Sequence, residues 1–467
     1  MHQLKPFIPM NLPKISLLVI VTLALTFTAC QQDEKAAPTV VETNPLDDQL
    51  VNLLNELSPE GGLSYFKLPS STDFDQIPQD PKNPLTAAKV ALGQLLYHET
   101  ALALTAETAE SMGTFSCASC HFASAGFQAG RHQGIGEGGS GFGLNGEGRT
   151  IAENFNVIHL DVQPIRSPST LNSAYQVAQL WNGQFGAVGP NEGTEYAWTP
   201  NSPIAVNELG YHGLETQAIA GLEVHRLMDE ETDISNINYY KPLFDEAFGD
   251  WPESNRYNRE TAGLAIAAYE RTLMANQSAF QKWLGGDYDA MTALQKEGAL
   301  LFFGKANCVN CHTGPALNSM EFHALGMKDL IDCEEPTFKT PIDDPANLGR
   351  GGFTNNADDF FKFKVPQLYN LKDSPFYGHG ASFRDLRSLI QYKNEAIAEN
   401  PLVSEAQLAD DFIPLGLTAT EIDAITIFLE DALHDPNLGR YEPDELLSGQ
   451  CFPNADTESS QDLGCQD

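Results

Sequence analysis

The pentapeptide Cys-x-x-Cys-His occurs twice in this chain of 467 residues, as Cys117-Ala-Ser-Cys120-His121 and as Cys308-Val-Asn-Cys311-His312. On a helical turn, the two cysteines of each motif share one face and can bond the two vinyl groups of one porphyrin. The histidine at the next position then lies under the iron as its proximal ligand. Two covalently bound c-type haems are therefore expected, one on each motif.

Two other kinds of site use cysteines at a similar spacing. A structural zinc site would require both cysteine pairs to converge on one ion. A thioredoxin-like redox pair lies in a βαβ setting and has no adjacent histidine. Haem attachment explains both motifs better than either alternative.

The net charge limits the partners of this chain. Its 27 Lys and Arg residues against 63 Asp and Glu residues give a formal charge of −36. Nucleic-acid binding needs a basic surface, so we expect no nucleic-acid partner. The acidic surface could steer a basic electron-transfer partner towards the protein, or it could simply keep an exported protein soluble.

The N-terminal segment resembles an export signal. Lys5 and Lys14 precede an apolar run over residues 15–27, which is too short to be a secure membrane span. The run ends at Phe27-Thr-Ala-Cys30, which resembles a bacterial lipoprotein signal in which Cys30 becomes lipidated. We expect a periplasmic protein anchored to the outer membrane through this lipid alone. The alternative is an ordinary signal peptide cleaved near the same point.

The periodicity of apolar residues predicts a mainly helical protein. Helices are expected from residue 83 towards the first motif, over 260–284, from Thr292 to the second motif, and over 418–433, whereas a glycine-rich loop follows the first motif. No stretch alternates apolar and polar residues for long enough to predict a sizeable sheet. The fold class is therefore mainly α, with two c-type cytochrome domains packed against each other, each with one covalently bound haem.

The expected segments follow from these patterns. They are a signal peptide at 1–30, an irregular lead-in at 31–80, an N-terminal cytochrome c domain at 81–285, a C-terminal cytochrome c domain at 286–439 and a loosely ordered acidic tail at 440–467. Outside the two motifs and Cys30, the cysteines are Cys333, Cys451 and Cys465. An oxidising compartment would favour a disulfide among these three, but their spacing does not identify the pair.

Further short motifs accompany the two haem-attachment sites in a fixed order. They are Asn-Pro-Leu-Thr at 83–86 and Val-Ala-Leu-Gly at 90–93, Arg-Ser-Pro-Ser-Thr-Leu-Asn at 166–172, Leu-Trp-Asn-Gly at 180–183, Ala-Tyr-Glu-Arg-Thr-Leu at 268–273, Gly-Lys-Ala-Asn-Cys at 304–308, and Phe-Lys-Val-Pro-Gln-Leu-Tyr-Asn at 363–370. With this set, most of residues 83–433 resembles the bacterial dihaem cytochrome c peroxidase family, which includes the MauG-type dihaem enzymes.

The resemblance implies different roles for the two haems. The haem on His121 would be peroxidatic, with a distal position that can open for hydrogen peroxide. The haem on His312 would accept electrons from a donor and pass them on. Trp181 falls where the family has a tryptophan between the haems that carries electrons, a role compatible with simple packing of the interface.

Peroxide reduction needs a group that moves a proton from one oxygen to the other. The family uses a glutamate that follows a Leu-Glu-x-Gln-Ala stretch, and Gln217 matches that stretch. In gapless register the glutamate position is occupied by Leu227. Glu223 and His225 lie just upstream and are the candidates for the acid–base group, and Arg226 could polarise the peroxide. Glu223 could equally be a solvated helix residue.

The distal iron ligands are predicted from the same resemblance. His132 could cap the first iron in a resting state. For the second iron, the family's peroxidases use methionine and the MauG-type enzymes use tyrosine. Tyr392 occupies this position, while Met320 and Met327 lie in another segment. Tyr392 could alternatively be an aromatic residue on a helix face.

The family also holds a calcium ion between its domains. Asp373 and Pro375 match one side of that site, the proline through its carbonyl oxygen. Arg166 stands where the family has a coordinating asparagine, and a cation there should repel calcium.

Three functions are compatible with these patterns. The first is a cytochrome c peroxidase that reduces hydrogen peroxide with electrons from a small periplasmic cytochrome c or cupredoxin. The second is a MauG-like oxidase that acts on a protein or small-molecule substrate, which Tyr392 favours. The third is a non-catalytic electron carrier or redox sensor, which the missing glutamate favours. The first is preferred because the match extends over the whole chain, and the resemblance also implies a homodimer.

Overall fold

The computed structural model describes residues 44–59 and 61–465, and contacts join residues from Asn44 onwards into one compact unit. The expected signal peptide at 1–30 lies outside the described residues. Residues 31–43 and residue 60 of the expected lead-in also lie outside them. The division into two cytochrome domains at residue 285 stays a prediction.

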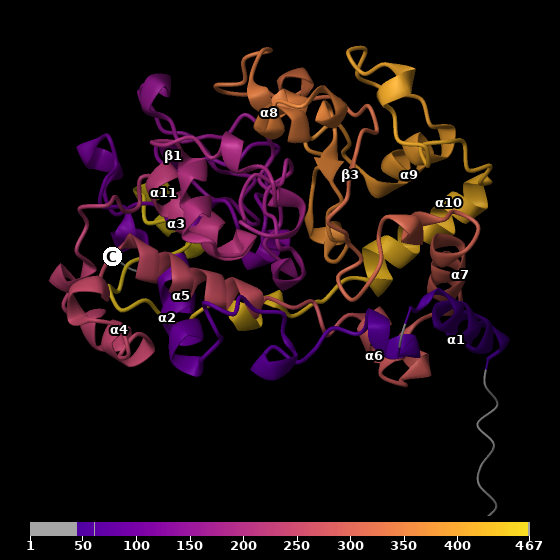
Figure 1. Ribbon diagram of the computed structural model, residues 1–467, viewed down its shortest axis with the longest axis horizontal. Helices are drawn as coiled ribbons and strands as arrows, with labels where there is room; N and C mark the ends of the chain where they lie inside the picture. Colours follow the sequence, from indigo (N-terminus) through magenta and orange to yellow (C-terminus); the bar gives the residue numbers. More distant parts are fainter. Residues whose placement is uncertain (1–43, 60, 466–467) are drawn as a thin grey trace, which may run out of the picture. The chain divides into compact units, whose positions relative to one another are not determined.

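The described chain is mainly helical, as predicted, and its strands are only two residues long (Figure 1). The α-helices are α1 (Pro45–Leu57), α2 (Ala87–His98), α3 (Gly213–Val224), α4 (Lys241–Ala247), α5 (Arg259–Arg271), α6 (Ala279–Leu284), α7 (Ala293–Phe303), α8 (Arg350–Thr354), α9 (Leu386–Glu395), α10 (Ala419–Ile427) and α11 (Thr457–Leu463). The strands form two antiparallel pairs, β1 (Gly139–Ser140) with β2 (Thr150–Ile151) and β3 (Phe322–His323) with β4 (Phe363–Lys364).

Two helix pairs cross closely, α2 with α5 and α7 with α10, and the first helix of each pair precedes a haem-attachment motif. A Cβ atom on Gly93 of α2 would lie 1.9 Å from the carbonyl oxygen of Ala265 on α5. A Cβ atom on Gly298 of α7 would lie 2.1 Å from the carbonyl oxygen of Ala424 on α10. Each crossing therefore requires glycine, because any side chain would push the two helices apart. The two motifs thus emerge from helix pairs that are built in the same way.

The helix starts agree with the capping residues in the sequence. Thr292 and Gln295 form a capping box at the start of α7, and Thr418 and Glu421 form another at the start of α10. The single helix expected over 260–284 is wrong, because the chain forms α5 and α6 with a break between them. Ser278 caps α6 with its side chain and so starts a new helix at this break.

The irregular lead-in expected at 31–80 is also wrong in part, because α1 lies within it. Leu50 and Leu54 of α1 are fully buried, and α1 packs against α7. Asp47 accepts a hydrogen bond of 2.7 Å from Nε1 of Trp283 and forms an ion pair with Lys296. An acidic segment is thus ordered by partners more than 200 positions away.

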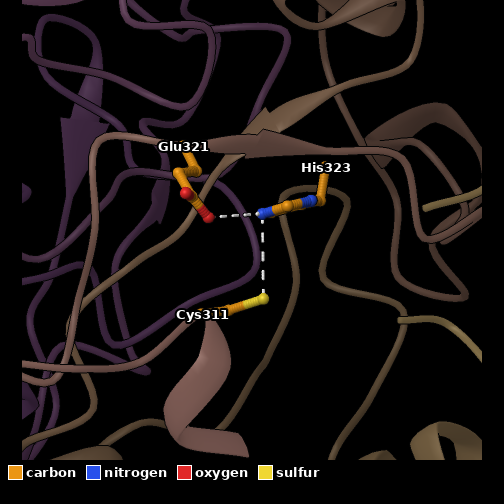
Figure 2. Close-up of side chains that lie close together, drawn as sticks. All are labelled: Cys311, Glu321 and His323. Carbon is orange, nitrogen blue, oxygen red and sulfur yellow. Dashed lines mark hydrogen bonds and ion pairs between the residues drawn. The ribbon is translucent and has the colours of Figure 1, made fainter. Parts of the chain in front are cut away.

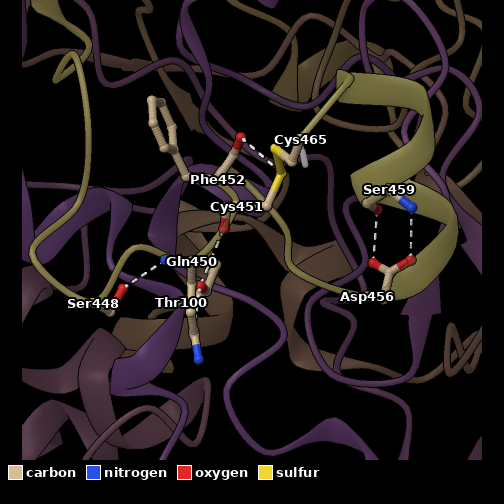
Figure 3. The surroundings of a disulfide bond; sticks show 8 residues. All are labelled: Thr100, Ser448, Gln450, Cys451, Phe452, Asp456, Ser459 and Cys465. Carbon is tan, nitrogen blue, oxygen red and sulfur yellow. Dashed lines mark hydrogen bonds between the residues drawn. A yellow bond between two sulfur atoms is a disulfide. The ribbon is translucent and has the colours of Figure 1, made fainter. Parts of the chain in front are cut away.

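The acidic tail at 440–467 was expected to be loosely ordered, and this expectation is wrong for its described part. A disulfide joins Cys451 to Cys465 and encloses α11 (Figure 3). Asp462 accepts 2.8 Å hydrogen bonds from the backbone N–H groups of Phe142 and Gly143 in the glycine-rich loop. The tail's carboxylates are therefore hydrogen-bond acceptors for this loop, which is why an acidic composition did not prevent order.

Candidate haem sites

Both haem-attachment motifs lie on short 3₁₀ turns, Cys117–Ser119 and Cys308–Asn310. The four cysteines of the motifs are free thiols. Two adjacent free thiols on one turn match what covalent attachment of a porphyrin requires.

The two proximal histidines are held by their backbone surroundings in the same way. His121 Nδ1 lies 3.4 Å from the carbonyl oxygen of Phe127, and His312 Nδ1 lies 3.1 Å from the carbonyl oxygens of Leu317 and Pro366. A carbonyl only accepts, so Nδ1 carries the hydrogen and Nε2 keeps its lone pair for iron. Burial lowers the pKa of both histidines to about 4, which keeps the rings neutral. The residues present therefore fit haem ligation at both motifs.

A cavity of about 270 Å³ lies against the second motif. Its wall includes Cys308, Cys311 and His312, and the surrounding side chains are mostly apolar, among them Phe302, Leu386, Ile390, Ile425 and Leu429. Apolar walls suit the faces of a porphyrin ring. The cavity is therefore the candidate seat of the second haem.

The structure places Tyr392 differently from the role predicted for it. Its hydroxyl donates to the carbonyl oxygen of Leu325, and its ring packs against Phe383 and Phe412. Tyr392 is absent from the described lining of the cavity, whereas Met327 and Lys393 belong to it. The expectation that Met327 is remote from this site is wrong, because the path of the chain returns its segment to the cavity.

Cys311, Glu321 and His323 lie close together (Figure 2). His323 Nε2 is 3.7 Å from Cys311 Sγ and 3.1 Å from a carboxylate oxygen of Glu321. As a metal site with three ligands, this set would need the sulfur of Cys311. Since haem attachment at the second motif would use that sulfur, we assign the cluster to the edge of the second haem site.

The glycine-rich loop closes over the first motif. A Cβ atom on Gly134 would lie 2.8 Å from Cys120 Sγ, and a Cβ atom on Gly136 would lie 2.3 Å from Oδ2 of Asp161. Glycine is thus required at both positions, because the backbone approaches a thiol and a carboxylate directly. The loop brings Asp161 to the first haem site, and no motif in the sequence had indicated this residue.

Asp161 and His225 form a hydrogen-bonded pair beside the first motif. His225 Nδ1 lies 2.9 Å from Asp161 Oδ2, and the Asp161 side chain is only 4% exposed. Burial disfavours a charged imidazole, but the charge and hydrogen bond of Asp161 outweigh it and raise the pKa of His225. In turn, burial opposes a charged Asp161, while His225 lowers the pKa of that carboxyl. The pair resembles the base and orienting acid of other proton-transfer sites.

Gln217 lies on the same side of α3 as His225. A Cβ atom on Gly221, between them, would meet only Gln217 Nε2 at 3.3 Å and His225 Cδ2 at 3.9 Å within 4 Å. The glycine therefore leaves an open surface flanked by an amide and an imidazole. The sequence prediction of Gln217 and His225 as site residues agrees with this arrangement.

Glu223 points away from that surface. Its side chain is 56% exposed and forms an ion pair with Arg259. Leu227, which occupies the family's glutamate position, is 1% exposed. Arg226 is bound by the buried carboxylate of Glu137 and by the carbonyl oxygen of His159, so its guanidinium is committed to the loop. Of the acidic and basic candidates, the structure brings only His225 next to Gln217.

A buried ion pair fixes the orientation of α3. Arg271 on α5 binds Glu215 on α3 through two hydrogen bonds, of 2.9 Å from Nε and 2.6 Å from Nη2. Both side chains are at most 1% exposed. The forked geometry fixes rotation as well as distance, and so it sets which face of α3 meets the first haem site.

His132, the predicted distal ligand of the first haem, lies in a contact between distant loops. Its Nε2 donates a 2.9 Å hydrogen bond to the carbonyl oxygen of Pro336, and its ring packs against Phe376. Only 3% of the residue is exposed. Its coordination of iron stays a prediction and would require this hydrogen bond to break.

Trp181 contacts two adjoining cavities, one of which is lined by the second motif. It lines the cavity of the second motif and also an adjoining cavity of about 120 Å³ that includes Arg166 and Gln128. Its Nε1 donates a 2.8 Å hydrogen bond to the carbonyl oxygen of Arg166, and its own carbonyl accepts from the N–H of Lys364 at 2.7 Å. These bonds fix the indole beside the cavity of the second motif, and its role in electron transfer stays a prediction.

The residues of the expected calcium site do not fit a calcium ion. Calcium takes six to eight oxygen ligands. The Asp373 carboxylate is already bound by Asn370 at 2.8 Å and His434 at 3.1 Å. Arg166 is buried and donates a 2.9 Å hydrogen bond to Oγ of Ser374, the residue that follows Asp373. The guanidinium of Arg166 stands where the resembling family has the oxygen ligand of an asparagine. We therefore assign neither Asp373 nor Pro375 to a calcium site.

The segment closed by the C-terminal disulfide contacts the first motif. Pro453, between the two cysteines, accepts hydrogen bonds of 3.0 and 3.1 Å from Ser116 and Ser119 on the motif's own turn. The structure thus identifies Cys451 and Cys465 as the bonded pair and leaves Cys333 as a free thiol.

Within the described residues, none of the helices combines the length and apolar character needed to span a bilayer.

Comparisons with known proteins show which proteins this chain is similar to. Residues 87–289 match the family described as di-haem cytochrome c peroxidase. The chain is 32% identical over 306 residues to the cytochrome c peroxidase Ccp of Escherichia coli (strain K12), covering 65% of this chain and 52% of that protein. It is 28% identical over 338 residues to the methylamine utilization protein MauG of Methylophilus methylotrophus, covering 71% and 80%. This chain therefore spans about half the length of the first relative and most of the second.

A solved structure shares the fold. It is that of a MauG-like protein associated with microbial copper homeostasis, with 22% sequence identity and a TM-score of 0.53. The match covers 79% of this chain and 95% of that protein. At this identity the likeness concerns the fold alone.

Proposed function

We propose, from the premise that this chain belongs to the di-haem cytochrome c peroxidase family, that it reduces hydrogen peroxide to water. The electrons would come from a small periplasmic redox protein, either a c-type cytochrome or a cupredoxin. The redox chemistry is supplied by the haems when they are bound at the two motifs. The protein supplies attachment, orientation and proton transfer.

The Asp161–His225 pair beside the first motif carries this proposal. Asp161 accepts the Nδ1 hydrogen of His225, which leaves Nε2 free to take a proton from one peroxide oxygen and return it to the other. Gln217, on the same side of α3, can donate a hydrogen bond to the substrate. His225 would thus replace the glutamate that the family has at the position of Leu227. With His225 in this role, the missing glutamate no longer favours a non-catalytic electron carrier.

Electrons would enter through the second site. Trp181 contacts the second cavity and is hydrogen-bonded to Arg166 on the segment that follows the glycine-rich loop, which supports its role as the carrier between the haems. The formal charge of −36 supports a basic donor, since opposite charges accelerate encounter. We also propose export to the periplasm, because the Cys451–Cys465 disulfide is of a kind that persists in oxidising compartments.

The substitution His225→Gln in the haem-loaded protein tests the proposal. General acid–base catalysis is worth about 10²–10⁴-fold, so kcat/KM for peroxide should fall by at least about 10² with a reduced cytochrome as donor. Glu223→Gln is the matched control, since this residue lies on the same helix but faces solvent, and its activity should stay unchanged.

Three results would contradict the proposal. Loss of activity in Glu223→Gln but not in His225→Gln would move the acid–base role away from the pair. An unsubstituted protein that exchanges electrons reversibly but never consumes peroxide would be a carrier. Peroxide consumption that modifies another molecule and leaves the reduced donor unchanged would indicate a MauG-like oxidase.

A further inference from the structure

Two buried cations flank Trp181. Arg166 is 2% exposed and Lys364 is 6% exposed. Both are tied to Trp181 through the backbone, Arg166 by its carbonyl oxygen and Lys364 by its N–H. The pair is therefore part of the surroundings of the proposed electron carrier.

Both cations have only neutral hydrogen-bond partners among the described residues. Arg166 donates to Gln128 Oε1 at 2.6 Å and to Ser374 Oγ at 2.9 Å, and its Nε has no partner. Lys364 donates to the side-chain carbonyl of Gln176. Burial lowers the pKa of Arg166 to about 10 and that of Lys364 to about 7. Buried charges in proteins are normally paired with an opposite charge, so this arrangement is incomplete.

The space beside the two cations can accept an anion. Arg166, Lys364 and Trp181 all line the same cavity of about 120 Å³. Lys364 and Trp181 also line the cavity of the second haem-attachment motif, so the two cavities adjoin. Haem carries two carboxylates, on the edge of the porphyrin opposite its vinyl groups. A haem bonded to Cys308 and Cys311 would therefore direct its carboxylates away from these cysteines.

We propose that Arg166 and Lys364 form a carboxylate-binding site for the haem propionates between the two haem sites, in place of a divalent cation. This inference rests on haem attachment at the two motifs and is independent of peroxide turnover. A guanidinium and an ammonium supply the positive charge here, and the neutral amides of Gln128 and Gln176 hold them in position. The site thereby places positive charge next to Trp181 without an exchangeable ion.

The test compares charge-removing with charge-retaining variants of the haem-loaded protein. Lys364→Met and Arg166→Met remove one charge each, and Lys364→Arg and Arg166→Lys retain it. Lys372→Met is the control, because Lys372 is 52% exposed and pairs with Asp431 at 2.7 Å. The haem midpoint potentials are measured by spectroelectrochemical titration, and the propionate bending modes by resonance Raman spectroscopy.

A cation near haem favours the reduced form, so its removal should lower a midpoint potential. We expect each methionine variant to shift the ratio of reduced to oxidised haem at least tenfold, which is about 59 mV for a one-electron couple. The charge-retaining variants and Lys372→Met should stay near the unsubstituted protein. Dialysis against a calcium chelator should change none of these potentials.

Several outcomes would overturn the proposal. Unchanged potentials in both methionine variants with full haem content would show that no propionate is bound there. Added chloride or phosphate could change the midpoint potentials of the unsubstituted protein and leave those of the methionine variants unchanged. That result would indicate that a free inorganic anion binds there instead of a propionate. If the methionine variants do not fold, Lys364→Arg decides alone, because an arginine binds a carboxylate in a forked geometry and should move the propionate mode. An unmoved mode would then contradict the proposal.

Discussion

The two haem-attachment sites are built alike at the backbone and differently around it. In both, a helix pair crosses at a glycine, Gly93 or Gly298, and the proximal imidazole donates to a carbonyl five or six positions later. The first site is then covered by a glycine-rich loop, a disulfide-closed tail and the Asp161–His225 pair. The second site has a cavity with mostly apolar walls. The shared part suits the attachment of a haem, and under the proposed function the difference separates a site that moves protons from a site that holds a haem for electron transfer.

Beyond His225→Gln, the largest expected effect concerns Asp161, which belongs to the first site only. Asp161→Asn should lower kcat/KM for peroxide by about 10-fold or more, which is less than the 10²–10⁴-fold of an acid–base group because Asp161 acts through His225. Asp161 raises the pKa of His225, so its loss lowers that pKa and moves the acidic limb of the pH–rate profile to lower pH. Steady-state rates between about pH 5 and pH 9, a range that spans the titration of histidine, check this.

The spectra and potential of the second haem serve as the internal control for this variant. If Asp161→Asn changed them as much as the peroxide kinetics, the two sites would not be separable in this way. An acidic limb that stayed in place would mean that His225 is not the titrating base.

A smaller effect is expected from opening the C-terminal disulfide. Cys451→Ser with Cys465→Ser releases a loop with a sequence separation of 14, for which the chain-entropy model gives about 3 kcal/mol. The tail binds the turn of the first motif through Pro453. Loss of the disulfide should therefore appear as faster hydrogen exchange in residues 116–119 and 139–149. Equal loosening around the second motif would contradict a role confined to the first site.

The smallest effect is expected at Tyr392. Its hydroxyl is bound to the carbonyl of Leu325 rather than directed into the second cavity, so Tyr392→Phe should leave the absorption and electron paramagnetic resonance spectra of the second haem unchanged. Met327→Leu is the companion variant, because Met327 lines the cavity. A change of ligand-field spectrum in Tyr392→Phe would instead restore the tyrosine ligation that the sequence predicted.

The sequence alone was sufficient wherever the determining contacts are local. Two thiols and an imidazole within five positions predict a haem without knowledge of the fold, and the structure presents them on single turns. The capping boxes at Thr292 and Thr418 involve residues three positions apart, so they too were readable from the sequence. That Gln217 and His225 are site residues rests on the family resemblance and stays a prediction.

Only the tertiary structure decided the contacts between distant segments. Asp161 meets His225 across 64 positions, and the loop that carries it shows no period or motif that predicts this meeting. Glu223 and His225 are two positions apart on one helix, yet the buried pair of Glu215 and Arg271 determines which of them faces the first haem site. The disulfide pair, the place of Met327 and the burial of Arg166 likewise depend on the path of the whole chain. The spacing of a haem-attachment motif and the hydrogen bonds of a capping box are fixed within a few residues, whereas the meeting of remote side chains depends on how all helices pack.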